Sequence, residues 1–368
     1  MKALRTPLCD LLGIDVPIIQ SGMGGVAGPE LAAEVCRAGG LGILAGLNVP
    51  ADVLRRNIAR LRELSSRPFG VNLWLHEAMQ PPVDVRTLSE SDVRGAQTEL
   101  NRFRAALGVE PKSGGPEPIP DLIDAQIDVI IEERVPVLSV GLGDPRQDRV
   151  ARCRERGIRV MAMATTVGDA LVLEASGVDV IVAQGGEAGG HRSTWVKPCS
   201  ASAASVGTMT LVPEIVDAVH VPVVAAGGVA DGRGLVAALA LGAQGILLGT
   251  RFVATRESKA APFFKQAIVA GTADSTRVTD VFTGLYARGI DNEFIRGYER
   301  SGAPVLPPLA QRNLAQDVYA AAALKGDQEH FPMLAGQSLG LIHALPGAAD
   351  VVRAIVEEAE RVRKRIAG

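Results

Sequence analysis

The sequence predicts an α/β protein built on a (β/α)8 barrel (a TIM barrel), with a smaller and mostly helical accessory domain. From Pro17 onward, short apolar runs alternate with segments of helical period. The runs show little polar alternation, which is typical of parallel strands buried on both faces. Two further segments do not belong to this repeat. We therefore assign residues 1–76 and 120–270 to the barrel, and residues 77–119 and 271–368 to the accessory domain.

Eight apolar runs are the expected barrel strands, over residues 18–23, 42–47, 70–75, 137–141, 160–164, 178–183, 223–226 and 246–252. Helices are expected after them, over residues 29–38, 51–64, 120–133, 145–156, 167–176, 211–219, 234–241 and 261–270. Eight strand–helix units within about 250 residues are the number that closes such a barrel.

The two segments outside the repeat differ from it in composition. Residues 77–119 are polar and charged, with a helical stretch near 93–107, and they interrupt the third unit after its strand. Residues 271–368 contain irregular chain followed by helices near 309–324 and 348–366. We expect the two segments to pack together and to cover the C-terminal mouth of the barrel.

Composition narrows the class of protein. The net charge of −3 and the pI near 6.0 provide nothing that would attract nucleic acid or an anionic membrane. The N-terminal stretch carries Asp10 and Asp15 where a signal peptide would be apolar, and no run of 18 apolar residues occurs. The cysteines form no CxxC pair and have no metal-ligand spacing; they are Cys9, Cys36, Cys153 and Cys199. We expect a cytoplasmic protein with free thiols, and with no metal, nucleic-acid or membrane partner.

The strongest candidate for chemistry is the loop after the sixth strand. Residues 178–195 read VDVIVAQGGEAGGHRSTW, in which four glycines precede His191. Glycine lets a ligand approach the backbone closely, and parallel barrels keep their chemistry at the C-terminal ends of their strands. We therefore predict that His191 is catalytic. The alternative at this point is a surface turn that happens to contain a histidine.

Two other strand ends are candidates for contact with a flat ligand. Gly22, Met23 and Gly24 follow the first strand, which raises the alternative of a dinucleotide-binding turn. A Rossmann fold would also place an acidic residue at the end of its second strand, whereas this strand ends at Asn48. Asn72, amid apolar residues of the third strand, can donate to and accept from a heterocycle edge, or can be purely structural.

The ends of the last two strands carry a possible phosphate site. Gly227 and Gly228 end the seventh strand, and Gly249 and Thr250 end the eighth. In barrels these two loops commonly hold a phosphate through backbone N–H groups. Tight turns without a ligand are the alternative. Arg251 could add charge there or pair with an acid elsewhere.

Assembled in order, these residues resemble a known family. The matching stretches are PIIQSGMGGVAG, AGGLGILAG, RPFGVNL, VIVAQGGEAGGHRS, VPVVAAGGVADGRG and GILLGTRF, with LAGQ at 334–337 as a weaker match. Together they cover most of residues 17–255 and are similar to the nitronate monooxygenases, formerly called 2-nitropropane dioxygenases.

The resemblance implies an FMN-dependent barrel enzyme that oxidises alkyl nitronates with O2 to a carbonyl compound and nitrite. His191 matches the family's active-site histidine, which would hydrogen-bond the nitro group or nitronate, or remove the α-proton of a neutral nitroalkane. The cofactor-binding residues that it implies are Gly22, Met23, Gly24, Asn72, Gln184, Gly189, Gly190, Gly227, Gly228, Gly249 and Thr250.

Two alternatives stay open at this stage. The first is an NAD(P)H-dependent flavin reductase acting on a quinone or an enoyl thioester, whose glycine–histidine loops look similar. The second is a flavin-binding protein without turnover. The expected partners are a small substrate, either a nitronate or a nitroalkane, and O2, and a homodimer is among the expected assemblies.

Overall fold

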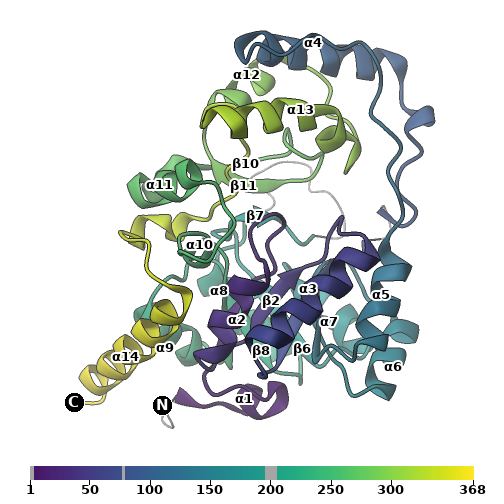
Figure 1. The fold of residues 1–368 in the computed structure, drawn as a ribbon. Coiled ribbons are helices and arrows are strands. Elements are labelled where there is room, and N and C mark those ends of the chain that lie inside the picture. Colours follow the sequence, from purple (N-terminus) through teal and green to yellow (C-terminus); the bar gives the residue numbers. More distant parts are fainter. Residues whose placement is uncertain (1–3, 77–78, 195–204) are drawn as a thin grey trace.

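The computed structural model describes residues 4–76, 79–194 and 205–368. Within these ranges eight parallel strands form one sheet in the order β1-β9-β8-β6-β5-β4-β3-β2 (Figure 1). Their bounds are β1 Ile18–Gln20, β2 Gly42–Ala45, β3 Phe69–Trp74, β4 Val137–Leu142, β5 Arg159–Ala164, β6 Val180–Gln184, β8 Val223–Ala226 and β9 Gly245–Leu248. The predicted (β/α)8 barrel is confirmed.

The barrel closes where β1 meets β2. Backbone pairing there is limited to a bridge between Ile19 and Leu41. The buried Gln20 side chain extends it, because its Oε1 accepts from the Ile43 N–H at 3.1 Å and its Nε2 donates to the Ile43 carbonyl at 3.1 Å. A side-chain amide thus replaces a missing pair of ladder bonds, which a buried strand edge requires.

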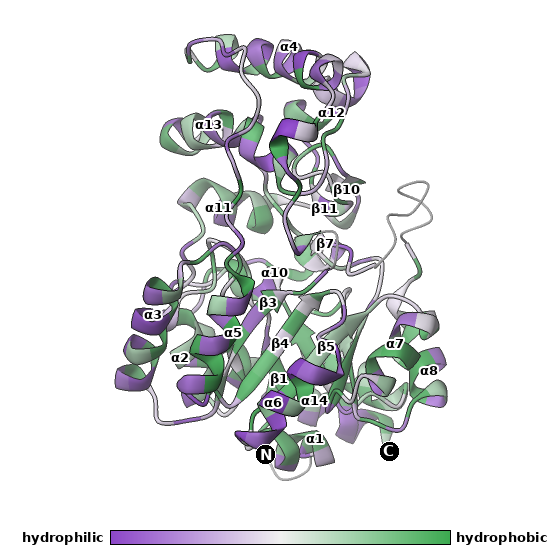
Figure 2. Cartoon of the chain, turned by 90° about the vertical axis from the view of Figure 1, so that its right-hand side faces the viewer, coloured by the Kyte–Doolittle hydropathy of each residue, from purple (hydrophilic) through white to green (hydrophobic). Residues whose placement is uncertain are grey.

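Helices surround the sheet, with their apolar faces turned toward it (Figure 2). They are α2 Pro29–Arg37, α3 Ala51–Leu64, α5 Ile123–Glu132, α6 Gln147–Glu155, α7 Val167–Ala175, α8 Thr208–Ala218 and α9 Gly232–Ala240. A short helix that the sequence did not predict, α1 (Pro7–Leu12), lies across the end of the barrel opposite the accessory helices (Figure 1). Its Leu8 and Leu12 join the inward-facing strand residues, so α1 seals that end of the barrel core.

Two helices near the C-terminus differ from their expected places. The last helix, α14 (Ala348–Ile366), packs along α9 and α2, and its Val351 and Ile355 belong to the barrel core. The expectation that this helix belongs to the accessory domain is wrong. The helix expected in eighth place, α11 (Pro262–Ala270), instead packs its Phe264 against residues 333–342. An amphipathic sequence pattern predicts that one face of a helix is buried, but it does not identify the element that covers this face.

The expected eighth strand is also shorter than predicted. It stops at Leu248, and residues Thr250–Val253 form a short helix, α10. The Thr250 hydroxyl accepts a hydrogen bond from the Gly336 N–H at 2.9 Å. The apolar run continues past the strand because α10 is itself buried, so hydrophobicity alone did not mark the boundary.

The accessory elements lie over the C-terminal ends of the barrel strands (Figure 1). They are η3 Val85–Thr87, α4 Glu90–Ala106, η5 Ala273–Ser275, β10 Thr276–Thr279, β11 Ala287–Ile290, α12 Glu293–Ser301, α13 Ala310–Lys325 and η6 Gln337–Leu341. Phe103 of α4 stacks on Phe294 of α12, and both belong to a hydrophobic cluster separate from the barrel core. Residues from both accessory segments thus share one core. Apart from α14, the domain boundaries stay a prediction.

Arg104 links α4 to α13 and supports a first prediction. Its fully buried guanidinium binds Asp317 through Nε at 3.0 Å and also donates to Gln97 and the Leu314 carbonyl. Arg104→Ala should therefore lower the free energy of unfolding of the accessory region by about 3 kcal/mol, the lower end for breaking a buried pair. The lower end of the range applies because Asp317 still has its ion pair with Lys112 in the variant.

Thermal unfolding followed by circular dichroism measures this loss. Arg102→Ala on the same helix is the matched control, because Arg102 is 73% exposed and its pair with Glu99 should contribute less than about 1 kcal/mol. Equal shifts for the two variants would contradict the role given to Arg104.

Candidate active site

A cavity of about 480 Å³ lies between the C-terminal ends of the strands and the accessory elements. Most predicted site residues line it: Gly22, Met23, Gly24, Asn72, Gln184, Gly189, Gly190, His191, Gly249 and Thr250. The accessory side contributes residues that the sequence did not single out: Phe282, Thr283, Arg312, Tyr319, Ala323, Phe331 and Pro332. Leu334, from the weakly matching stretch LAGQ, also lines the cavity. None of the described residues of the inserted segment 77–119 lines the cavity.

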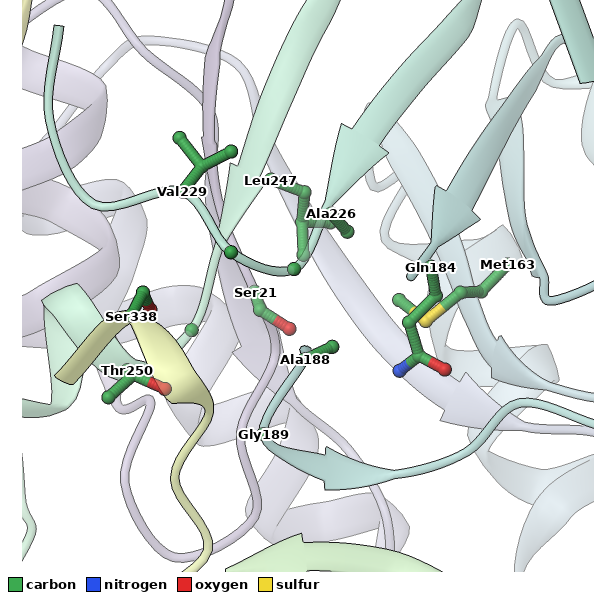
Figure 3. A pocket seen from close by; sticks show the side chains of 13 residues that line it. Ser21, Met163, Gln184, Ala188, Gly189, Ala226, Val229, Leu247, Thr250 and Ser338 are labelled. Atoms are coloured by element: carbon green, nitrogen blue, oxygen red, sulfur yellow. The ribbon is translucent and has the colours of Figure 1, made fainter. Parts of the chain in front are cut away.

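A smaller crevice of about 50 Å³ adjoins the cavity and is lined by the two remaining predicted residues, Gly227 and Gly228. The hydroxyl side chains Ser21, Thr250 and Ser338 also line it (Figure 3). No charged side chain of the described chain does. An anion in this crevice would therefore be held by backbone N–H groups and hydroxyls. Ser338 escaped prediction because it comes from η6, far along the chain.

The crevice and the cavity share part of their walls. The residues common to both are Ser21, Met163, Gln184, Gly189, Gly249 and Thr250. One elongated ligand could therefore extend from the crevice, with a phosphate there, into the cavity, with a flat ring beside His191.

Several glycines of this site have no room for a side chain. A Cβ on Gly22 would lie 2.3 Å from the Asn72 Cβ, and one on Gly189 would lie 2.4 Å from the Gly336 nitrogen. Gly227 and Gly228 have φ values of +102° and +71°, which L-residues rarely adopt. Neighbouring protein atoms thus fill the place of a side chain at Gly22 and Gly189, and the backbone conformation itself favours glycine at Gly227 and Gly228.

The two predicted amides have different surroundings. Asn72 donates from Nδ2 to the Ser139 hydroxyl at 3.0 Å within the barrel wall. Gln184 donates from Nε2 to the His191 carbonyl at 2.9 Å and accepts from the Ser193 N–H at 3.0 Å. Gln184 therefore holds both sides of the turn that carries His191, in addition to lining the cavity.

Two buried arginines hold the backbone of the glycine-rich loop by hydrogen bonds to its carbonyl groups. Arg192 donates from Nη1 to the Gly185 carbonyl at 2.6 Å, and Arg288 of β11 donates from Nε to the Gly186 carbonyl at 2.9 Å. Burial lowers the pKa of Arg192 to about 10, so it still carries its charge at neutral pH. A loop rich in glycine is thus held in one conformation by partners that the sequence pattern did not reveal.

Glu187 of the same loop occupies the start of α8. Its carboxylate accepts from the Thr208 N–H at 2.9 and 3.0 Å and from the Thr208 hydroxyl at 2.8 Å. The positive end of α8 is therefore already neutralised. The N-terminus of α8 is thus occupied by Glu187, and the phosphate site at the ends of β8 and β9 stays a prediction.

His191 lies in a short strand, β7 (Gly190–His191), which pairs with Ala287 of β11. Its Nε2 lies 2.8 Å from the Thr283 hydroxyl, and its ring meets Trp74 edge-on at 4.6 Å between centroids. Burial, with a smaller contribution from the charge of Arg312, lowers the pKa of His191 to about 3. The imidazole is therefore neutral at physiological pH and held in a defined orientation.

This lowered pKa predicts a pH-dependent stability. The unfolded chain protonates His191 near pH 6.5, whereas the folded protein resists protonation down to about pH 3. Stability attributable to His191 is complete above pH 6.5 and falls as the pH drops, by about 2 kcal/mol at pH 5. Urea unfolding at pH 7.5 and pH 5 should show a larger loss for the natural protein than for His191→Asn. Equal losses would contradict the lowered pKa.

Arg251 has neither of its expected roles. Its Nη2 donates to the carbonyls of Ala254 and Ala344, at 2.8 and 2.9 Å, and so ties α10 to the chain that leads into α14.

Cys9, Cys36 and Cys153 are buried, and burial raises the pKa of Cys36 and Cys153 to about 11. Cys199 lies outside the described residues.

In the described part of the chain, no group of three His, Cys, Asp or Glu side chains is placed to hold a metal ion. The helices of that part are too short or too polar to cross a membrane.

The fold is a (β/α)8 barrel with a cavity at its C-terminal mouth, which is where enzymes of this fold hold their active sites. Residues 5–358 match the family model described as nitronate monooxygenase, so the chain belongs to that family and is an oxidoreductase of it. A probable nitronate monooxygenase of Staphylococcus saprophyticus is 37% identical, covering 98% of this chain and 99% of its own. One from Staphylococcus aureus is 36% identical, covering 97% and 98%.

Solved structures are similar over the same length. The nitroalkane oxidase of Streptomyces ansochromogenes has a TM-score of 0.86 and 35% identity, covering 98% of this chain and 99% of its own. FabK of Thermotoga maritima has a TM-score of 0.77 and 31% identity, covering 99% of each chain.

Proposed function

We propose that the protein is an FMN-dependent nitronate monooxygenase that oxidises alkyl nitronates with O2 to a carbonyl compound and nitrite. The observation that carries this proposal is the continuous wall from the glycine crevice to His191. Gly227, Gly228, Gly249 and Thr250 would hold the cofactor phosphate. FMN supplies the electron-transfer chemistry between substrate and O2, which no side chain of this site can provide.

The residues on the substrate side have separate tasks. The neutral His191, held by Thr283 and Gln184, would hydrogen-bond the nitronate oxygens. Removal of an α-proton is the less favourable role, because a base works best when its pKa lies near the operating pH. Phe282, Tyr319 and the other accessory residues of the wall would exclude water above the reacting carbon.

The purified protein should be yellow, and the flavin released by denaturation should be FMN and not FAD. With a preformed alkyl nitronate in air, nitrite and the carbonyl compound should appear in equal amounts. A colourless protein would remove the cofactor assignment. A yellow protein that forms no nitrite would remove the nitronate assignment.

The second candidate is an NAD(P)H-dependent reduction of a quinone or an enoyl thioester. It is favoured by the likeness to FabK over the whole chain. Anaerobic mixing separates the two functions: rapid bleaching of the flavin by NAD(P)H would support the reductase, and bleaching by the nitronate alone would support the monooxygenase. Bleaching by neither donor would favour a flavin-binding protein without turnover.

A further inference from the structure

The cavity wall has an uncompensated positive charge. Among the described residues that line it, Arg312 and Lys259 are cationic, and no Asp or Glu is present. Neither side chain forms an ion pair with a carboxylate of the described chain. Both side chains are exposed at the edge of the cavity, so water screens their charges in part, and what remains attracts an anion that enters the cavity.

Arg312 is the cation placed on the His191 side. It lines the cavity together with His191, Thr283 and Tyr319. Its charge contributes to the lowered pKa of His191 and acts on Tyr319, which stays protonated because burial raises its pKa. Lys259 lies elsewhere on the wall, with its side chain against the backbone of Gly28: a Cβ added to Gly28 would be only 2.4 Å from the Lys259 Cε.

The start of α13 is held in a fixed position, and this fixes the backbone from which the Arg312 side chain extends. The buried Gln311 donates from Nε2 to the Val281 carbonyl at 2.9 Å and accepts from the Leu306 N–H at 3.0 Å. Two turns later the Tyr319 hydroxyl donates to the Phe282 carbonyl at 3.0 Å. The helix of Arg312 is therefore tied to the same segment, 281–283, whose Thr283 contacts His191.

We propose that Arg312 binds the two oxygens of the nitronate and selects this anion over the neutral nitroalkane. The chemistry fits, because a nitronate carries its negative charge on two oxygens in one plane. A guanidinium presents paired N–H donors in one plane and binds such groups through two parallel hydrogen bonds. His191, which is neutral, then orients the anion without adding charge. This inference rests on the proposed function for the identity of the substrate.

Nitrate, an unreactive planar anion, tests the site without turnover. In the purified holoprotein, nitrate should shift the NMR signal of the His191 ring, which the spectrum of His191→Asn identifies. Arg312→Gln should weaken nitrate binding at least about 10-fold. Arg312→Lys should weaken it less, because lysine keeps the positive charge but lacks the paired, coplanar N–H donors of arginine. Arg312→Gln should also raise the pKa of His191. Arg300→Gln, which removes an exposed arginine of α12 paired with Glu293, is the matched control.

Kinetics then test selection. Arg312→Gln should lower kcat/KM for a preformed nitronate by about 10–100-fold, mainly through KM, and should change the value for neutral nitroalkane less than about 3-fold. Equal effects on both substrates, or nitrate binding unchanged from that of Arg300→Gln, would overturn the role of Arg312. Nitrate binding that depends on Arg312 in a protein that forms no nitrite would keep the anion site and overturn the proposed function instead.

Discussion

His191→Asn is expected to lower kcat/KM by about 10–100-fold on a preformed nitronate, and by no more than this on the neutral nitroalkane, while FMN stays bound. A hydrogen bond to a charged group is worth about 1.5–3 kcal/mol and one to a neutral group about 0.5–1.5 kcal/mol, and each 1.4 kcal/mol is a factor of ten. The expectation that the neutral substrate loses no more than the anion follows from the pKa of His191, lowered to about 3, which makes the imidazole a poor base but leaves it a good hydrogen-bonding partner.

The pair of substrates distinguishes the two roles. If His191 instead removes the α-proton, the loss with neutral nitroalkane should reach about 10²–10⁴-fold, and the loss with preformed nitronate should be much smaller. His220→Asn is the matched control, since His220 is exposed and pairs with Glu174 on the barrel surface. Unimpaired turnover of both substrates by His191→Asn, with flavin in place, would end the catalytic assignment of this residue.

Gly228→Asp should give a folded but colourless protein. The new carboxylate would lie in the crevice proposed for the phosphate, and a Cβ at this position would already be 3.6 Å from the Glu187 side chain. Placing like charges together costs several kcal/mol, so FMN affinity should fall by about 100-fold or more. Absorbance at the flavin band after purification, and titration with added FMN, measure the loss.

Gly228→Asn separates charge from shape. Gly228 has φ of +71°, and asparagine tolerates this left-handed conformation better than other residues with a side chain of its size. The asparagine variant should keep most of its FMN affinity, because it fills the same space without a charge. If both variants bind FMN as tightly as the natural protein, the phosphate does not lie beside Gly228. If both lose it equally, steric exclusion and not charge explains the loss.

The barrel and the glycine-rich strand ends at its mouth were predictable because both depend on local features. Runs such as Val223–Ala226 are apolar on both faces, which only a covered parallel strand tolerates, and glycine follows where backbone must turn at the mouth. The topology of a parallel barrel then brings every strand end to one mouth. Gly22, Asn72, His191 and Gly228 consequently line adjoining spaces, although they lie far apart in the chain.

Tertiary structure alone decided which helix completes the barrel. The faces of α11 and α14 are both amphipathic, and nothing local states that Phe264 packs on the accessory side while Ile355 packs on the barrel. Hydrophobic burial is not directional, so a sequence pattern specifies that a face is covered but not by what. The same limit applied to α1, whose six residues are too few to show a period.

The environment of His191 also depended on contacts distant in sequence. The histidine was identified from the glycines beside it, but its neutral state comes from burial under residues about 90 positions away and from the charge of Arg312. Arg288, Thr283 and Arg312 carry no motif, because each acts through its position in space. The sequence therefore determined the fold and indicated His191 as the candidate catalytic residue. Only the folded chain determined the protonation of His191 and its charged neighbour, since electrostatic energies depend on distance and burial.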